Sequence, residues 1–119
     1  MPVSPCSPRP WLAVALFGLL YSVLAPAHAA APVDDAVEAS IAGEFALSAG
    51  KLDEAARWYL EAARASDDDA GLAERASRIA LLADDDARAG EALALWRARA
   101  PQSLALREGE VTLALRRND

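Results

Sequence analysis

The chain has 119 residues, a formal net charge of −6, one cysteine and one histidine. This length holds one modest domain, and the acidic balance gives no electrostatic reason to bind nucleic acid. One cysteine and one histidine are too few for a disulfide framework or a zinc site. The alanine-rich composition favours a helical protein.

The segment 1–29 differs from the rest of the chain. Several prolines and a single cation, Arg9, precede an uncharged stretch over 11–25. Ala27-His28-Ala29 then supplies a small-x-small site of the kind that a signal peptidase reads. We therefore predict a cleaved signal peptide over 1–29 and export, which in a bacterium leads to the periplasm.

A retained membrane anchor is the alternative, since the uncharged segment before Val33 could just cross a bilayer. Cys6 precedes the apolar stretch, so it cannot become the lipidated first residue of a mature chain. Cleavage would leave a protein without cysteine, whose stability comes from helix packing. A short linker over 30–35 would then lead into the helices.

Apolar residues recur three and four apart from Asp34 to Asn118, and no proline interrupts them before Pro101. This periodicity predicts an all-α protein. The expected helices cover 35–49, 53–66, 70–83, 87–99 and 103–117.

Aspartates stand where most of these helices should begin, as N-capping and the positive end of the helix dipole favour. The residues are Asp34-Asp35, Asp53, Asp67-Asp68-Asp69 and Asp84-Asp85-Asp86, with Ser103 before the last helix. Both triplets lack the following glycine and distal glutamate of a calcium loop, so we predict capping rather than metal binding. Arginines gather at the opposite helix ends: Arg64, Arg97, Arg99, Arg116 and Arg117.

A sequence repeat with a period of 34 residues runs through the helical part of the chain. Phe45-Ala46-Leu47, Ile79-Ala80-Leu81 and Leu113-Ala114-Leu115 each precede a turn former, which is Gly50, Asp84 or Asn118. A 34-residue period built of two helices predicts a repeat solenoid of helical hairpins. The units would be 36–69, 70–103 and a partial 104–119, about two and a half repeats.

The pattern resembles the tetratricopeptide repeat (TPR) family. Gly43, Gly50, Ala55, Tyr59 and Ala62 carry the resemblance in the first unit, and Ala89, Leu93 and Pro101 carry it in the second. The second unit departs from the pattern at two places, because Ser77 and Asp84 stand where the first has Gly43 and Gly50. The first unit departs at one, because Asp67 stands where Pro101 closes the second.

The segment 73–80, with the acidic turn before it and 95–101 after it, is also weakly similar to the N-terminal repeats of large Gram-negative envelope TPR proteins, including outer-membrane adaptors for a protease. That similarity covers too little of the chain to transfer a partner. We expect an exported TPR protein whose partner the sequence does not name.

We expect no enzymatic activity and no cofactor, because the cleaved chain would lack the histidine and cysteine that a triad, a thiolate or a zinc site needs. Trp58 and Trp96 fall on second helices, where we predict core packing rather than a ligand cradle.

The resemblance implies that first helices line a groove that holds a partner peptide or helix. The matching positions are Ser40, Glu44, Leu47, Ser48, Glu74, Arg78, Leu81, Leu82, Glu108 and Thr112. A protein partner with cationic and apolar side chains would fit this lining. The alternative for each position is a solvated helix face.

The sequence stops at Asn118-Asp119, where the third unit's second helix should begin. Either 103–117 is a terminal capping helix, or the chain is the N-terminal fragment or a structural spacer of a longer TPR adaptor, without its own ligand site. We favour the fragment, because apolar residues occur on more than one side of that helix.

Overall fold

The computed structural model describes residues 34–118, which form five α-helices and, within that range, no strand. They are α2 (Asp35–Ser48), α3 (Leu52–Ala65), α4 (Ala70–Leu82), α5 (Asp86–Arg99) and α6 (Leu104–Asn118). Each boundary lies within one residue of the predicted one, so the all-α prediction is confirmed. The predicted signal peptide, its cleavage site and Asp119 lie outside the described residues.

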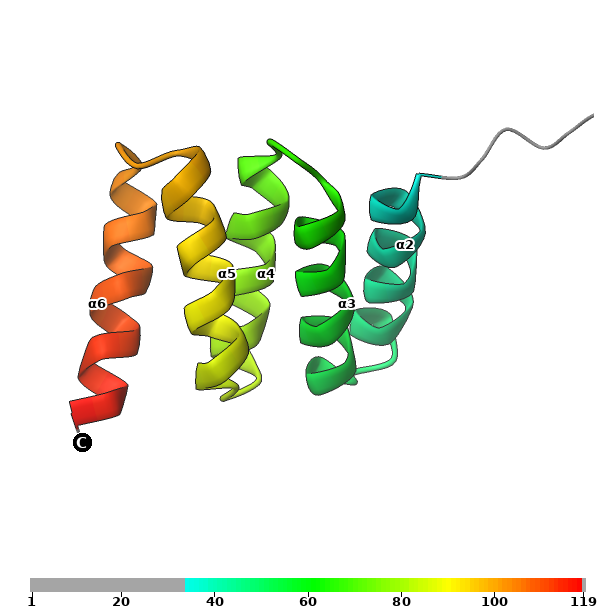
Figure 1. Ribbon diagram of the computed structural model, residues 1–119. Coiled ribbons are helices and arrows are strands. Elements are labelled where there is room, and N and C mark those ends of the chain that lie inside the picture. Colours follow the sequence, from blue (N-terminus) through cyan, green and yellow to red (C-terminus); the bar gives the residue numbers. More distant parts are fainter. Residues whose placement is uncertain (1–33, 119) are drawn as a thin grey trace, which may run out of the picture. The chain divides into compact units, whose positions relative to one another are not determined.

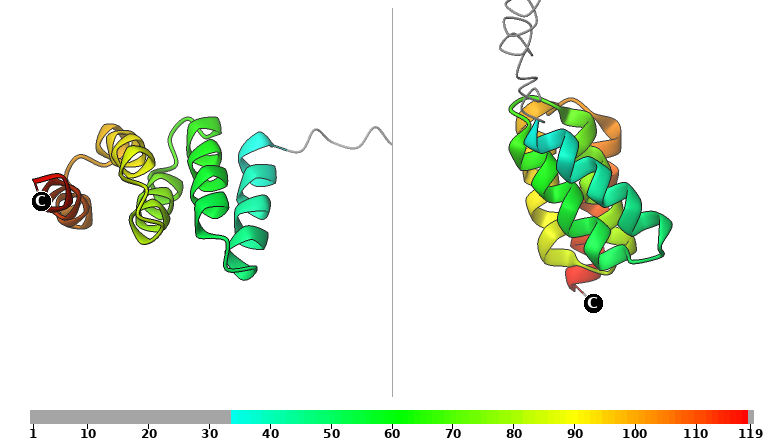
Figure 2. Two further views of the ribbon diagram at one scale, coloured as in Figure 1. Left: turned by 90° about the horizontal axis from the view of Figure 1, so that it is seen from below. Right: turned by 90° about the vertical axis from the view of Figure 1, so that its right-hand side faces the viewer.

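The helices follow one another side by side, with α2 and α6 at the two ends of the row (Figure 1). Each helix packs against the next in the sequence, and α3 also approaches α5 while α4 approaches α6. Seen from the α2 end, the helices lie one behind another (Figure 2, right). Across 34–118, none has the length and apolar character needed to cross a bilayer.

Alanine dominates the core and lets helix axes approach closely. The residues with no exposed surface are Ala55, Ala56, Ala62, Ala63, Ala73, Ala76, Ala89 and Ala92. Tyr59, Leu93 and Trp96 supply bulk between the helices and are at most 3% exposed. The 34-residue repeat aligns three pairs of positions between α3 and α5, and both members of each pair are buried: 55/89, 59/93 and 62/96.

The turns after α2 and α4 share one geometry. Lys51 N–H donates to Ala46 O at 2.9 Å and Gly50 N–H to Leu47 O at 3.0 Å. The same two bonds recur at the corresponding positions after α4, from Asp85 to Ala80 and from Asp84 to Leu81. This is the Schellman C-cap, which needs a left-handed residue, and Gly50 and Asp84 have φ values of 73° and 56°.

The capping prediction is confirmed at four helix starts. Carboxylate oxygens of Asp34, Asp69 and Asp85 accept from the backbone N–H groups of Ala36, Leu72 and Arg88, and Ser103 Oγ accepts from Leu106 N–H. The bond from Arg88 N–H is the main reason that the pKa of Asp85 lies below its ordinary value. Asp53 is a correction: α3 begins at Leu52 after an N-cap, Lys51, whose side chain makes no capping bond.

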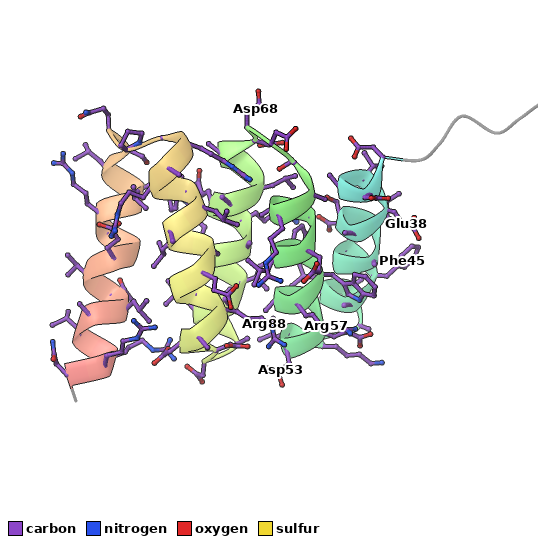
Figure 3. The ribbon with its side chains drawn as sticks, in the orientation of Figure 1. Glu38, Phe45, Asp53, Arg57, Asp68 and Arg88 are labelled. Atoms are coloured by element: carbon purple, nitrogen blue, oxygen red, sulfur yellow. The ribbon has the colours of Figure 1, made fainter. Side chains whose placement is uncertain are left out.

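Asp53 lies instead within the first turn of α3 (Figure 3), because the Schellman turn at Gly50 starts the next helix one residue earlier than predicted. There its charge still faces the positive end of the helix dipole. Asp67 and Asp68 lie in the α3–α4 connection, which Figure 3 shows at Asp68.

Arginines near helix C-termini bind connections between preceding helices. The Arg99 guanidinium on α5 donates to the carbonyls of Ala63, Ser66 and Asp69, around the α3–α4 connection. On α6, Arg116 donates to Leu81 O and to the Asp84 carboxylate, each at 2.8 Å. Each connection is thus held by the second helix that follows it.

A hollow between α2 and α4

The groove prediction points to the surface where α2 and α4 flank α3. The backbones of α2 and α4 do not approach each other closely. Between them lies an open hollow of about 400 Å³, hereafter the α2–α4 hollow. Its lining is Leu47, Gly71, Glu74, Arg75, Arg78, Ile79 and Leu82.

The hollow unites four of the predicted groove residues. Glu74, Arg78 and Leu82 follow one another at four-residue spacing and share one face of α4, opposite Leu47 of α2. Arg78 forms an ion pair with Glu74 at 2.6 Å, yet the Arg78 side chain stays 64% exposed. Leu82 is 68% exposed, so the hollow presents apolar surface beside two accessible opposite charges.

Glu44 is engaged within the protein, although its side chain is 56% exposed. Its carboxylate accepts from the Tyr59 hydroxyl of α3 and pairs with Arg75 of α4. The Arg75 guanidinium also lies 4.9 Å from the Tyr59 ring centre, within cation–π range. This cluster ties α2, α3 and α4 together, and Arg75 is its member that lines the hollow.

Tyr59 is the buried member of the cluster, with only 1% of its surface exposed. Burial and then the hydrogen bond to Glu44 raise the pKa of the Tyr59 hydroxyl. Its ring packs on Gly43, where an added Cβ would lie 2.8 Å from Tyr59 Cε2. Glycine at 43 is therefore needed for this close approach.

The other predicted groove residues lie outside the α2–α4 hollow. Ser40 and Glu44 border a second hollow next to the α3–α4 connection, and the Ser40 hydroxyl donates to Ala36 O at 2.7 Å. Ser48 is exposed at the end of α2, and Leu81 is half-buried. Thr112 is exposed on α6, where its Oγ1 donates to Glu108 O at 2.8 Å.

Three residues of the hollow, Gly71, Arg75 and Ile79, are not among the predicted groove positions, and Arg75 is the charged one. Its signal was present, because Arg75 stands four residues before Ile79 and seven before Leu82, on the same helix face. Its ion pair with Glu44 spans 31 residues of sequence, which helix periodicity does not reveal.

The two tryptophans differ in their surroundings. Trp96 is 3% exposed, as core packing predicts. Trp58 packs against the core on one side and on the other borders a hollow with Asp35, Glu38 and Glu61. Arg57 (labelled in Figure 3) covers the Trp58 ring at 4.8 Å from its centre, so this indole already has a cation partner.

Among residues 34–118, no three metal-ligating side chains gather closely enough to hold an ion. The α2–α4 hollow combines a carboxylate, two guanidinium groups and apolar walls, a set suited to contact with another chain. Comparison with protein-family models, with curated proteins and with solved structures gives no match.

Proposed function

We propose that residues 34–118 form a TPR-type repeat module that acts without catalysis by binding a protein segment in the α2–α4 hollow. The carrying observation is the hollow itself, where Glu74, Arg78 and Leu82 of α4 meet Leu47 of α2. An extended or helical segment with one apolar and one cationic side chain fits this surface: the apolar group lies between the leucines and the cation pairs with Glu74.

Two observations support the repeat assignment. The Schellman turns at Gly50 and Asp84 stand at equivalent places in the two hairpins and have the same hydrogen bonds. Position pairs 55/89, 59/93 and 62/96 are buried alike. Both fit the period of a TPR unit.

We further propose that the module works outside the cytoplasm of a bacterial cell, in the periplasm, because 1–29 has the composition and cleavage site of a signal peptide. The intact mass of the purified chain tests this. A mass that begins at Ala30 supports export and cleavage, whereas retention of 1–29 after expression in a bacterial host favours the anchor.

Glu74→Ala/Arg78→Ala tests the hollow. We expect the Kd of the double variant for its bound segment to rise at least about tenfold. A factor of ten corresponds to about 1.4 kcal/mol, and truncation of central contacts often costs more. Captured cell-envelope proteins are first ranked by quantitative mass spectrometry. Peptides from the leading candidate are then titrated by fluorescence anisotropy.

Glu54→Ala/Arg57→Ala is the matched control, because it removes another exposed acid–arginine pair within one helix, on α3. Binding should survive in this control. Equal binding by wild type and by the Glu74/Arg78 variant would remove the hollow from the function, and loss in both variants would indicate a non-specific charge effect.

A further inference from the structure

Both ends of the helix row expose an apolar stripe. On α2, Val37, Ile41 and Phe45 follow one another at four-residue spacing and are 50%, 51% and 74% exposed. On α6, Leu104, Val111 and Leu115 share one face and are 73%, 58% and 63% exposed. We call these the α2 stripe and the α6 stripe.

The two stripes lie on the outer sides of the end helices. α2 buries Ala36, Ala39, Gly43 and Ala46, which leaves its stripe on the side away from α3. Figure 3 shows Phe45 and Glu38 on this outer side of α2. α6 buries only Leu106 and Leu113, toward α5, so its stripe also faces outward.

The charges on one side of the two stripes are complementary. α2 carries three acids and no cation; Glu38 lies on one side of its stripe, and Glu44, which is paired with Arg75, lies on the other. Beside the α6 stripe lies Arg107, which is exposed and forms no ion pair within 34–118. Glu108 lies on the other side of the α6 stripe, toward the groove face.

The register of these groups matches as well. Glu38 and Arg107 are each the fourth residue of their helix, and α2 and α6 run in the same direction along the row (Figure 1). Placing a second copy end to end, with its α2 parallel to α6, sets Arg107 beside Glu38. Glu108 then faces the side of α2 that carries Ser40 and Glu44, where the ion pair with Arg75 already offsets the charge of Glu44.

We infer that the occupant of each stripe is the opposite stripe of a second copy of this chain, so that copies associate head to tail through α6 and α2. Apolar surface is removed from water on both sides, and the Arg107–Glu38 contact sets the orientation. Such a heterologous contact leaves one free stripe at each end, so the assembly grows beyond a dimer as the concentration rises.

The test uses two variants that each disable one end. Phe45→Glu places a charge in the α2 stripe and Val111→Glu places one in the α6 stripe, both at exposed positions outside the core. The chain is expressed with its own N-terminus, its mass is determined, and sedimentation velocity is recorded over a concentration series. Circular dichroism and urea unfolding check that both variants fold like wild type.

We expect wild type to form species larger than a dimer, and each variant alone to remain monomeric. Mixed at equal concentration, the variants should form a 1:1 dimer and stop there, because Phe45→Glu still has an intact α6 stripe and Val111→Glu an intact α2 stripe. Glu74→Ala/Arg78→Ala should associate like wild type, which separates this proposal from the function of the hollow.

A charge exchange tests the orientation. Glu38→Arg alone should weaken association about threefold to fivefold in Kd, the range of a rim ion pair, and Glu38→Arg combined with Arg107→Glu should restore it.

Several results would overturn the proposal. One is a wild-type chain that stays monomeric at millimolar concentration. Another is a Val111→Glu chain that still dimerises, which would indicate an α2–α2 contact. Failure of the two variants to pair on mixing would exclude the head-to-tail contact itself.

Discussion

Two residues at equivalent places in the sequence adopt the same left-handed conformation, but only one of them is glycine. Gly50 has a φ of 73° and Asp84 a φ of 56°, and both close a helix with a Schellman turn. A side chain in this conformation brings its Cβ close to the following carbonyl oxygen. Asp84 therefore carries a backbone cost that Gly50 avoids.

Asp84→Gly should raise the free energy of unfolding by about 0.5–1 kcal/mol, because relief of the left-handed strain exceeds the added chain entropy of glycine. The lost ion pair with Arg116 contributes little, since the Asp84 side chain is 86% exposed. Urea unfolding measures the change. Gly50→Asp is the reverse control and should lower stability by a similar amount; a destabilised Asp84→Gly would show that the carboxylate matters more than the backbone.

At the scale of the elements, arginines connect helices that are not neighbours in sequence. Arg99 of α5 donates to Ala63 O at 2.6 Å, to Ser66 O at 2.5 Å and to Asp69 O at 3.0 Å. These carbonyls lie where α3 is ending and α4 has not begun, so helix bonds do not satisfy them. The guanidinium therefore acts as a C-cap supplied by another helix.

Arg99→Ala should lower the free energy of unfolding by about 1.5–3 kcal/mol, the range for hydrogen bonds to a charged group. Arg97→Ala is the matched control from the same turn, because Arg97 pairs with Glu110 while 63% exposed. Its effect should stay within about 0.5 kcal/mol. Chemical denaturation of both variants measures these changes, and an equal loss of unfolding free energy in the two would contradict a specific role of Arg99.

The helices themselves could be predicted from the sequence because their signals are local. Apolar periodicity marked the helices, and Asp69 and Asp85 marked two starts by their capping chemistry. The capping role expected of Asp53 was wrong, because the turn at Gly50 makes Lys51 the N-cap and leaves Asp53 inside the first turn of α3.

The candidate site was less accessible to sequence reasoning. The four-residue spacing of Glu74, Arg78 and Leu82 placed them on one face, and the structure brings that face opposite Leu47. The engagement of Glu44 could not be predicted, because it depends on Tyr59 and Arg75 from two other helices. Side-chain pairs between helices follow from packing angles, which a single sequence does not contain.

For the whole described unit, burial is distributed unevenly along the row. α3 buries six residues and touches α2, α4 and α5, whereas α6 buries two. Local opening is easiest where few apolar contacts must break.

Hydrogen exchange should follow this gradient. At concentrations where the chain is monomeric, we expect backbone amides in the middle of α6 to exchange at least about tenfold faster than those in the middle of α3. Mass spectrometry of peptic fragments measures both. Equal protection in all five helices would instead indicate one cooperative unit.

The backward reach of the arginines also bears on the order in which the chain can fold. Arg99 and Arg116 each bind a connection that lies about one hairpin earlier in the sequence. In a chain that is synthesised from its N-terminus, the α3–α4 connection therefore lacks its arginine contact until α5 has been made. The α4–α5 connection lacks its contact until α6 has been made. Because these partners are only 30 to 36 residues apart, each closure spans a short loop and should be fast. Assembly would then advance stepwise from α2, with each new helix stabilising the turn behind it.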